Sequence, residues 1–113
     1  MNTNENGNQI VAFDPDDNTV KQTKSTASSV IAHTSSTTLI TLLSANSNRL
    51  GAIIFNDSAA SHLYIKLGAS VSLTSFSVKL GPGAYYEIPC CYSGVVTGVC
   101  ESASGTIRVT ELT

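Results

Sequence analysis

The chain changes character near Lys24, and this change limits what it can fold into. Residues 1–24 are polar and acidic, and they hold six of the fourteen Asp, Glu, Lys and Arg residues of the chain. Residues 25–113 carry the other eight, and short apolar runs alternate there with Gly, Ser, Asn and Pro. A chain of 113 residues has room for one hydrophobic core. The sequence therefore predicts an N-terminal arm over residues 1–24 and a single domain over residues 25–113.

The domain is expected to be all-β. Apolar runs of strand length recur at intervals of about 8 to 14 residues, which is typical of a sandwich or barrel. In one of them Leu63, Ile65 and Leu67 share a phase, as in a half-buried strand. No window keeps a helical period with caps at both ends. The pattern predicts an antiparallel β-sandwich of seven or eight strands, wound like a jelly roll, with an extended N-terminal arm. The expected strands cover residues 27–33, 37–43, 49–56, 62–67, 73–80, 84–88, 95–101 and 106–112.

The arm contains one apolar group, formed by Ile10, Val11 and Phe13. One interpretation is an ordinary disordered terminus. The other is a segment that docks on a neighbouring subunit, where it adds a strand to an exposed sheet edge. The second is favoured because a solvated tail gains nothing from three large apolar side chains in a row of four residues.

Charge and hydropathy exclude two classes of partner. The formal net charge is −2, and no cluster of Lys and Arg provides the basic surface of a nucleic-acid binder. No apolar stretch approaches the roughly 20 residues that a membrane span needs. The first residues do not have the basic and apolar regions of a signal peptide. We expect a protein that acts where it is made or in an assembly formed there, without nucleic acid or membrane as partner.

The three cysteines, Cys90, Cys91 and Cys100, are odd in number and two are adjacent, which makes a poor disulfide framework. They are interpreted first as small apolar core residues. A bridge from Cys90 or Cys91 to Cys100 is the alternative. There is no CxxC motif, and the two histidines, His33 and His62, do not have the spacing of zinc ligands. No metal and no cofactor are expected.

No group of residues predicts catalysis. The serines do not form a GxSxG motif, and the nearest acid to His62 is Asp57, at a junction between loop and strand. The sequence Gly81-Pro82-Gly83 indicates a hairpin turn, because the Lys and helix of a phosphate loop do not follow it. We therefore expect a protein without enzymatic activity and without catalytic residues. The late carboxylates, Glu87, Glu101 and Glu111, are expected to pair with Arg49 or Arg108 or to stay solvated. Arg108 is expected to reach Glu101 or Glu111 where the strand register allows.

The tyrosines are the candidate binding residues. Tyr64 lies in the opposite phase to Leu63, while Tyr85, Tyr86 and Tyr92 flank Pro89 and the adjacent cysteines. Two interpretations stay open: an interface between subunits with hydroxyl groups at its rim, or a site that binds glycans.

A set of motifs in residues 49–112 is similar to one found in small β-structured virion proteins of tailed bacteriophages. The first is Arg-x-Gly, followed by an apolar strand ending Asn-x-Ser and then by Leu-Tyr-Ile-Lys-Leu-Gly. Next come Tyr-Tyr-Glu-x-Pro, Tyr-x-Gly-x-x-x-Gly and a final Val-Thr-Glu-Leu. The matching residues are Arg49, Gly51, Asn56, Ser58, Leu63, Tyr64, Ile65, Lys66, Leu67, Gly68, Tyr85, Tyr86, Glu87, Pro89, Tyr92, Gly94, Gly98, Val109, Thr110, Glu111 and Leu112. One departure is Cys100, where the family pattern has an aromatic residue.

This resemblance implies a capsid decoration (cement) protein on the outer surface of the virion, made in the host cytoplasm. Its expected partners are the major capsid protein and copies of itself, with a homotrimer as the expected oligomer. The apolar group of the arm, Ile10, Val11 and Phe13, is then expected to contact the capsid, and the four tyrosines to lie between subunits. The alternative function is a fibre- or tail-associated module that recognises host glycans.

Overall fold

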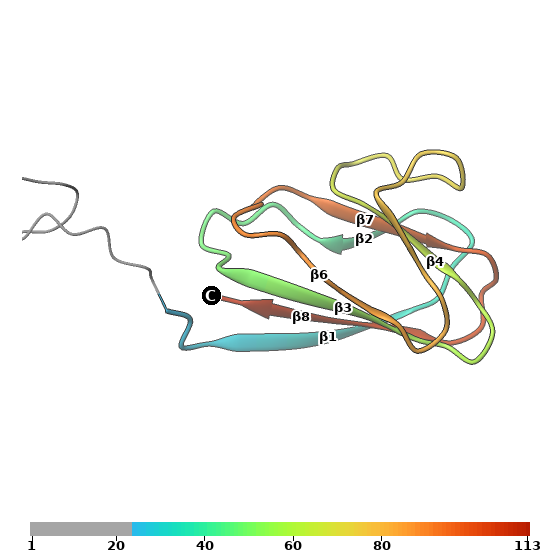
Figure 1. Ribbon diagram of the computed structural model, residues 1–113, viewed down its shortest axis with the longest axis horizontal. Helices are drawn as coiled ribbons and strands as arrows, with labels where there is room; N and C mark the ends of the chain where they lie inside the picture. Colours follow the sequence, from blue (N-terminus) through green and yellow to red (C-terminus); the bar gives the residue numbers. More distant parts are fainter. Residues whose placement is uncertain (1–23) are drawn as a thin grey trace, which may run out of the picture.

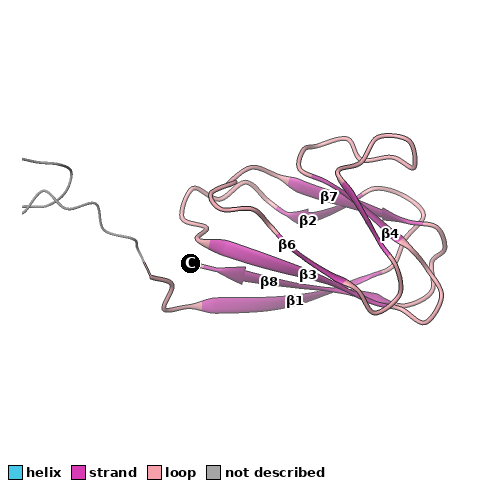
Figure 2. Cartoon of the chain, viewed as in Figure 1, coloured by secondary structure: helices cyan, strands magenta, loops and turns pink. Residues whose placement is uncertain are grey.

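The structure is a computed structural model that describes residues 24–113. Residues 1–23, with the apolar group Ile10, Val11 and Phe13, lie outside the described part. The described chain is all-β, without a helix, which confirms the predicted class (Figure 2). Its strands are β1 (Ser28–Thr34), β2 (Ile40–Leu43), β3 (Gly51–Asp57), β4 (Leu63–Lys66), β5 (Val78–Leu80), β6 (Tyr85–Glu87), β7 (Val96–Cys100) and β8 (Thr106–Leu112).

The strands form two antiparallel sheets that face each other (Figure 1). One sheet has the order β1-β8-β3-β6 and the other has the order β2-β7-β4-β5. The strands pair from the two ends of the described chain inward: β1 with β8, β2 with β7, β3 with β6 and β4 with β5. This nesting is the winding of an eight-stranded jelly roll. The predicted sandwich and its jelly-roll winding are both confirmed.

The core lies between the two sheets and follows the period of two along each strand. In the first sheet Ile54 and Val109 face inward as neighbours in the register of β3 and β8. In the second, Leu63 and Ile65 face inward from β4 and are fully buried. The other fully buried apolar side chains are those of Val96 and Ile107.

The predicted strand over residues 73–80 is shorter than expected, because only its last three residues form β5. Residues 68–77 instead fold into a loop over the outer surface of β4 and β7, where Tyr64, Val71 and Val99 form a second small cluster. Thr97 holds the loop in place, since its Oγ1 donates to the Gly68 carbonyl at 2.8 Å and accepts from the Val71 amide at 3.3 Å. The serines that interrupt the apolar pattern there form turns instead of a ladder.

The other predicted strands agree with the structure to within about three residues at each end. β3 is a central strand, paired on both sides, as its apolar sequence predicts. Gly81-Pro82-Gly83 forms the expected turn, in which the Ala84 amide donates to the Gly81 carbonyl and Gly83 takes a φ of 79°. Within residues 24–113 no helical segment meets the length and apolarity of a membrane span.

Candidate interaction surface

The two outer faces of the sandwich differ in what covers them. The face of the β2-β7-β4-β5 sheet lies partly under the loop of residues 68–77, which leaves Tyr64 only 8% exposed. No segment of the described chain packs in the same way on the outer face of the β1-β8-β3-β6 sheet. We call this second face the bare face. Because large unpaired apolar surfaces mark interaction sites, it is the first candidate for a functional surface.

The register of the four strands shows which side chains share the bare face. One row across the sheet consists of Val30, Thr110, Ile53 and Glu87. The next row consists of Ala32, Arg108, Phe55 and Tyr85. Val30 is 65% exposed and Tyr85 is 64% exposed, while Ile53 and Phe55 are half-buried. The bare face therefore presents large apolar side chains from three of its four strands.

Charges are few on the bare face. Arg108 and Asp57 form an exposed ion pair, with Arg108 Nε 2.8 Å from Asp57 Oδ2. The predicted partners of Arg108, Glu101 and Glu111, were wrong, because the register brings the end of β3 beside β8 and aims Glu111 at Arg49. Apart from this neutralised pair, Glu87 is the remaining charged residue on the bare face. A partner can cover such a surface without burying many charges.

Charges are also few on the side of the sandwich that carries β1 and β2, where Glu111 is one charged residue. The sequence has no Asp, Glu, Lys or Arg between Lys24 and Arg49. β1 and β2 are the edge strands of their two sheets. Between them lies a shallow groove of about 320 Å³ whose lining includes Ile31 and His33.

The four candidate tyrosines do not form one surface. Tyr64 points outward from β4, as its phase predicts, but it is covered by Phe76, whose ring meets its own edge-on at 4.9 Å between centroids. Tyr85 lies on the bare face, and Tyr86, the next residue, points inward and packs on the core. Tyr92 is half-buried, and its hydroxyl donates to the Val95 carbonyl at 2.7 Å. Of the four, only Tyr85 is widely exposed.

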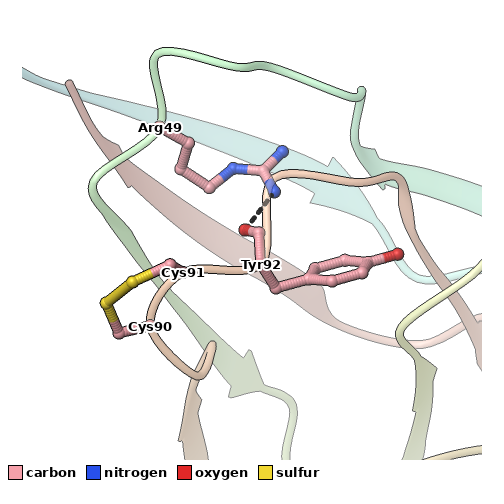
Figure 3. The surroundings of a disulfide bond; sticks show 4 residues. All are labelled: Arg49, Cys90, Cys91 and Tyr92. Atoms are coloured by element: carbon pink, nitrogen blue, oxygen red, sulfur yellow. Dashed lines mark hydrogen bonds between the residues drawn. A yellow bond between two sulfur atoms is a disulfide. The ribbon is translucent and has the colours of Figure 1, made fainter.

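The adjacent cysteines form a disulfide, which the sequence did not predict (Figure 3). The bond joins Cys90 to Cys91 in the loop between β6 and β7, where both residues are exposed. Neither of the bridges to Cys100 that the sequence left open is present. The interpretation as an apolar core residue is confirmed for Cys100, which is reduced and 2% exposed, and was wrong for the other two.

Arg49 fastens the loop that carries this disulfide to the end of the sandwich. Its guanidinium donates to the carbonyl of Tyr92 at 3.2 Å (Figure 3) and to the carbonyl of Gly94 at 2.9 Å. It also donates to the Ser44 carbonyl at 2.5 Å and to Glu111 Oε2 at 2.9 Å. The side chain of Arg49 is 1% exposed, so each of these acceptors replaces lost water. The first residue of the motif set is therefore structural.

Asn56 has the same kind of role at the opposite end of β3. Its Nδ2 lies within 3.1 Å of three carbonyl oxygens, those of Ser61, Leu80 and Gly81. Asn56 is 1% exposed, and its amide joins the turn after β3 to the turn after β5. Ser58, the last residue of the Asn-x-Ser motif, accepts a hydrogen bond from the Ser61 amide at 2.9 Å. These motif residues shape turns and do not form a reactive site.

The polar group most similar to a catalytic site joins His62, Glu101 and Tyr64. His62 Nδ1 lies 2.9 Å from Glu101 Oε1, and the Tyr64 hydroxyl donates to Glu101 Oε2 at 3.1 Å. Desolvation acts to raise the pKa of Glu101, but the hydrogen bonds from His62 and Tyr64 outweigh it and hold the pKa below its ordinary value of 4.5. Among the hydrogen bonds of the described residues, none brings a hydroxyl or thiol to the second ring nitrogen of His62. Within the described part of the chain, His62 therefore has no hydroxyl or thiol in position to activate.

Within residues 24–113 no three His, Cys, Asp or Glu side chains come together in a way that would hold a metal ion. The candidate surface is the bare face with the neighbouring edge of β1, where large apolar side chains are exposed.

Most of this surface lies outside the four tyrosines that were predicted as binding residues. The signal was present in the run Ala52-Ile53-Ile54-Phe55, which is apolar in both phases. In an antiparallel sheet, every second residue of a strand normally faces water. A strand whose residues are apolar on both sides, such as β3, therefore indicates that both of its faces are covered in the assembled protein. Val30 and Ile31 on β1 give the same signal.

Comparison with known proteins found no family that matches this sequence, no similar curated protein and no similar solved structure.

Proposed function

We propose that the protein is a structural component of a bacteriophage virion. In this proposal it is a capsid decoration (cement) protein, made in the host cytoplasm and bound to the outer surface of the capsid. Its partners are the major capsid protein and copies of itself, with a trimer as the expected oligomer. The observation that carries the proposal is the bare face, on which Val30, Phe55 and Tyr85 stay exposed or half-exposed with few charges around them.

Three further observations support a structural role. The motif residues Arg49 and Asn56 are buried hydrogen-bonding centres and not parts of a cleft. Among the described residues, no serine, threonine or cysteine side chain makes a hydrogen bond to the side chain of His62 or Glu101. The jelly roll is a fold of viral capsid domains, although it is also a fold of lectins, so the fold by itself supports the class weakly.

The mechanism we propose is mechanical. Copies cover one another's apolar surfaces, and the arm of each copy contacts the capsid through Ile10, Val11 and Phe13. Once one copy of an oligomer is bound, its other arms act at high effective concentration, so several weak contacts give a strong attachment. No chemical step is required.

The experiment uses virions of the phage that encodes the chain, stripped of this protein and mixed with purified full-length protein. A cryo-electron microscopy map is expected to show jelly-roll density on the outer shell. A variant with Ile10, Val11 and Phe13 all changed to Ser is expected to lose occupancy, whereas Val20→Ser in the same arm keeps it. Density at a fibre tip, or equal occupancy of the two variants, would contradict the proposal.

The alternative, recognition of host glycans, finds less support. Sugar-binding surfaces present flat aromatic side chains to solvent, and of the three tyrosines near Pro89 only Tyr85 is widely exposed. Tyr86 packs against the core and Tyr92 is held by Val95. A glycan-array signal that is lost in Tyr85→Ala would favour this alternative.

A further inference from the structure

The open edge of β1 is unlike the other open edges of the sandwich. β5 and β6 are three residues long, and β2 has four residues with an irregular register between Thr41 and Leu43. Short length and bulges are the usual ways in which proteins prevent an edge strand from pairing with another chain. β1 has seven residues, and its register with β8 is continuous from end to end. Its sequence Ser-Ser-Val-Ile-Ala-His-Thr has no Lys, Glu, Asp or Pro to block the edge.

The ladder with β8 shows which backbone groups of β1 are unpaired. At its two ends the Thr113 amide donates to Ala27 and the Ser35 amide donates to Gly105. Since bonding directions alternate along an antiparallel strand, the odd-numbered residues of β1 bond to β8. The amides and carbonyls of the even-numbered residues therefore point to the open edge. These residues are Ser28, Val30, Ala32 and Thr34.

Large apolar side chains stand beside this edge on both faces of the sheet. Val30 is 65% exposed on the bare face, and Ile31 is 54% exposed on the inner face, at the mouth of the groove beside β2. A long exposed edge without charged residues or Pro, with apolar side chains at its centre, is a template for another strand. The strand that suits this edge best is also seven residues long and without charged residues, and a second copy of β1 is such a strand.

We propose that β1 pairs with β1 of a second copy, antiparallel and about a two-fold axis that passes beside Ile31. In this register Ser28 faces Thr34 of the second copy and Val30 faces Ala32. Each of the four open residues on one copy then meets an open residue on the other, and every unpaired amide and carbonyl of the edge gains a partner. The two sheets join into one of eight strands. Such a contact uses the same surface on both copies, as two-fold interfaces do.

The side chains agree with this register. On the bare face Val30 meets Ala32, so the two bare faces continue into each other. On the inner face Ile31 meets Ile31 at the axis. His33 comes opposite Ser29. No Asp, Glu, Lys or Arg lies in any pair of the contact.

The contact rests on the proposed function only in that both require copies to associate. A capsid role with a three-fold contact would survive without it, and the pairing would survive in a protein of another function. The β1 pairing and the proposed capsid function can therefore be contradicted independently.

Cysteine crosslinking tests the pairing and its register. Residues opposite each other in a non-hydrogen-bonded antiparallel pair have Cβ atoms about 4.5–5.5 Å apart, close to the distance that a disulfide spans. Ile31→Cys places two thiols at the axis and is expected to give a covalent dimer under mild oxidation. Val30→Cys, with a side chain of similar exposure, faces Ala32 and is expected to give little dimer. The native cysteines do not interfere, because two are joined and Cys100 is buried.

The unmodified full-length protein provides a second test, by light scattering during size-exclusion chromatography. We expect an even multiple of the chain mass of 11.8 kDa: a dimer from the pairing alone, or a hexamer where the pairing joins two of the trimers that the proposed function expects. Val30→Pro removes an amide from the open edge, leaves the β8 ladder intact and is expected to halve the mass. Leu73→Lys, which changes an exposed apolar side chain in the loop of residues 68–77, is the control and is expected to keep it. Circular dichroism checks that both variants fold.

Three results would overturn the pairing. They are a monomer at every concentration, a trimer in which Ile31→Cys does not crosslink, and efficient crosslinking by Val30→Cys instead of Ile31→Cys. The trimer result would leave the proposed capsid function intact, whereas loss of capsid binding with a retained even-numbered oligomer would remove only that function.

Discussion

Arg49 Nε and Glu111 Oε2 lie 2.9 Å apart, in a pair where the arginine side chain is 1% exposed and the carboxylate side chain 21%. The pair joins the start of β3 to the end of β8, and the same guanidinium holds the loop after β6 through Tyr92 and Gly94. A charge buried this deeply is stable only with its full set of acceptors. Arg49 therefore stabilises the fold by holding together three segments that are distant in sequence.

Breaking this pair is expected to destabilise the protein strongly. Arg49→Ala leaves Glu111 and three carbonyls without their donor, and the expected loss is about 3–5 kcal/mol of unfolding free energy. Urea unfolding measures it. Arg108→Ala, which breaks the exposed pair with Asp57, is the matched control and is expected to cost less than about 1 kcal/mol. Equal losses in the two variants would contradict the structural role of Arg49.

Asn56→Ala is expected to lower the unfolding free energy by about 2–4 kcal/mol, because it leaves buried carbonyls without a donor. The loss of stability can be measured by urea unfolding. Asn48→Ala, at an exposed asparagine, is the control and is expected to stay within about 0.5 kcal/mol of the native protein. A small effect of Asn56→Ala would show that water replaces its amide at the turns.

Gly98 on β7 is needed for the close approach of side chains in the core. A Cβ at this position would lie 2.7 Å from Leu42 Cδ1 and 3.2 Å from Leu63 Cδ1. Gly98→Ala is therefore expected to cost about 1–3 kcal/mol through overpacking. Because the clash is mainly with Leu42, adding Leu42→Val is expected to recover part of the loss, measured by thermal unfolding. If Gly98→Ala has the same cost with and without Leu42→Val, the clash is not the cause.

Glu101 is expected to make stability depend on acid pH. Its folded pKa is held below the ordinary value of 4.5, so its contribution is fully present above that value and is lost as the pH falls through the folded pKa. Glu101→Gln is expected to reduce the fall in melting temperature on acidification. Glu87→Gln, which removes an exposed carboxylate from β6, is the control. A carboxyl titration of Glu101 by NMR with a midpoint above 4.5 would contradict the expectation.

The cysteines give a simple chemical prediction. A thiol reagent is expected to find no reactive group in the native protein, because Cys90 and Cys91 are joined and Cys100 is buried. After unfolding without a reductant it is expected to find one thiol per chain, and after reduction all three. Three thiols in the unfolded and unreduced protein would show that the disulfide is not formed.

The sequence determined the fold class because its signals are local. Each signal depends on residues that are close together in the chain. The alternation at Leu63 and Ile65 predicts a strand, and Gly81-Pro82-Gly83 predicts a turn. Such signals predict the position of a strand, its buried phase and the position of a turn. These three predictions agree with the structure. The strand predicted over residues 73–80 was wrong in its first five residues, because serines suit turns as well as strands. The choice between turn and strand there depends on packing against β4 and β7.

Only the tertiary structure decided which surfaces are covered and which side chains meet. The sequence marks Tyr64 and Tyr85 alike, yet the loop of residues 68–77 buries the first and nothing in the described chain packs over the second. Likewise, Arg108 meets Asp57 because of the register between β3 and β8, which joins residues about fifty positions apart. Period and turn chemistry act between neighbours in the chain, whereas burial, pairing and open edges are properties of the assembled sheets. For that reason the long, uncharged edge of β1 became visible only when all eight strands were in place.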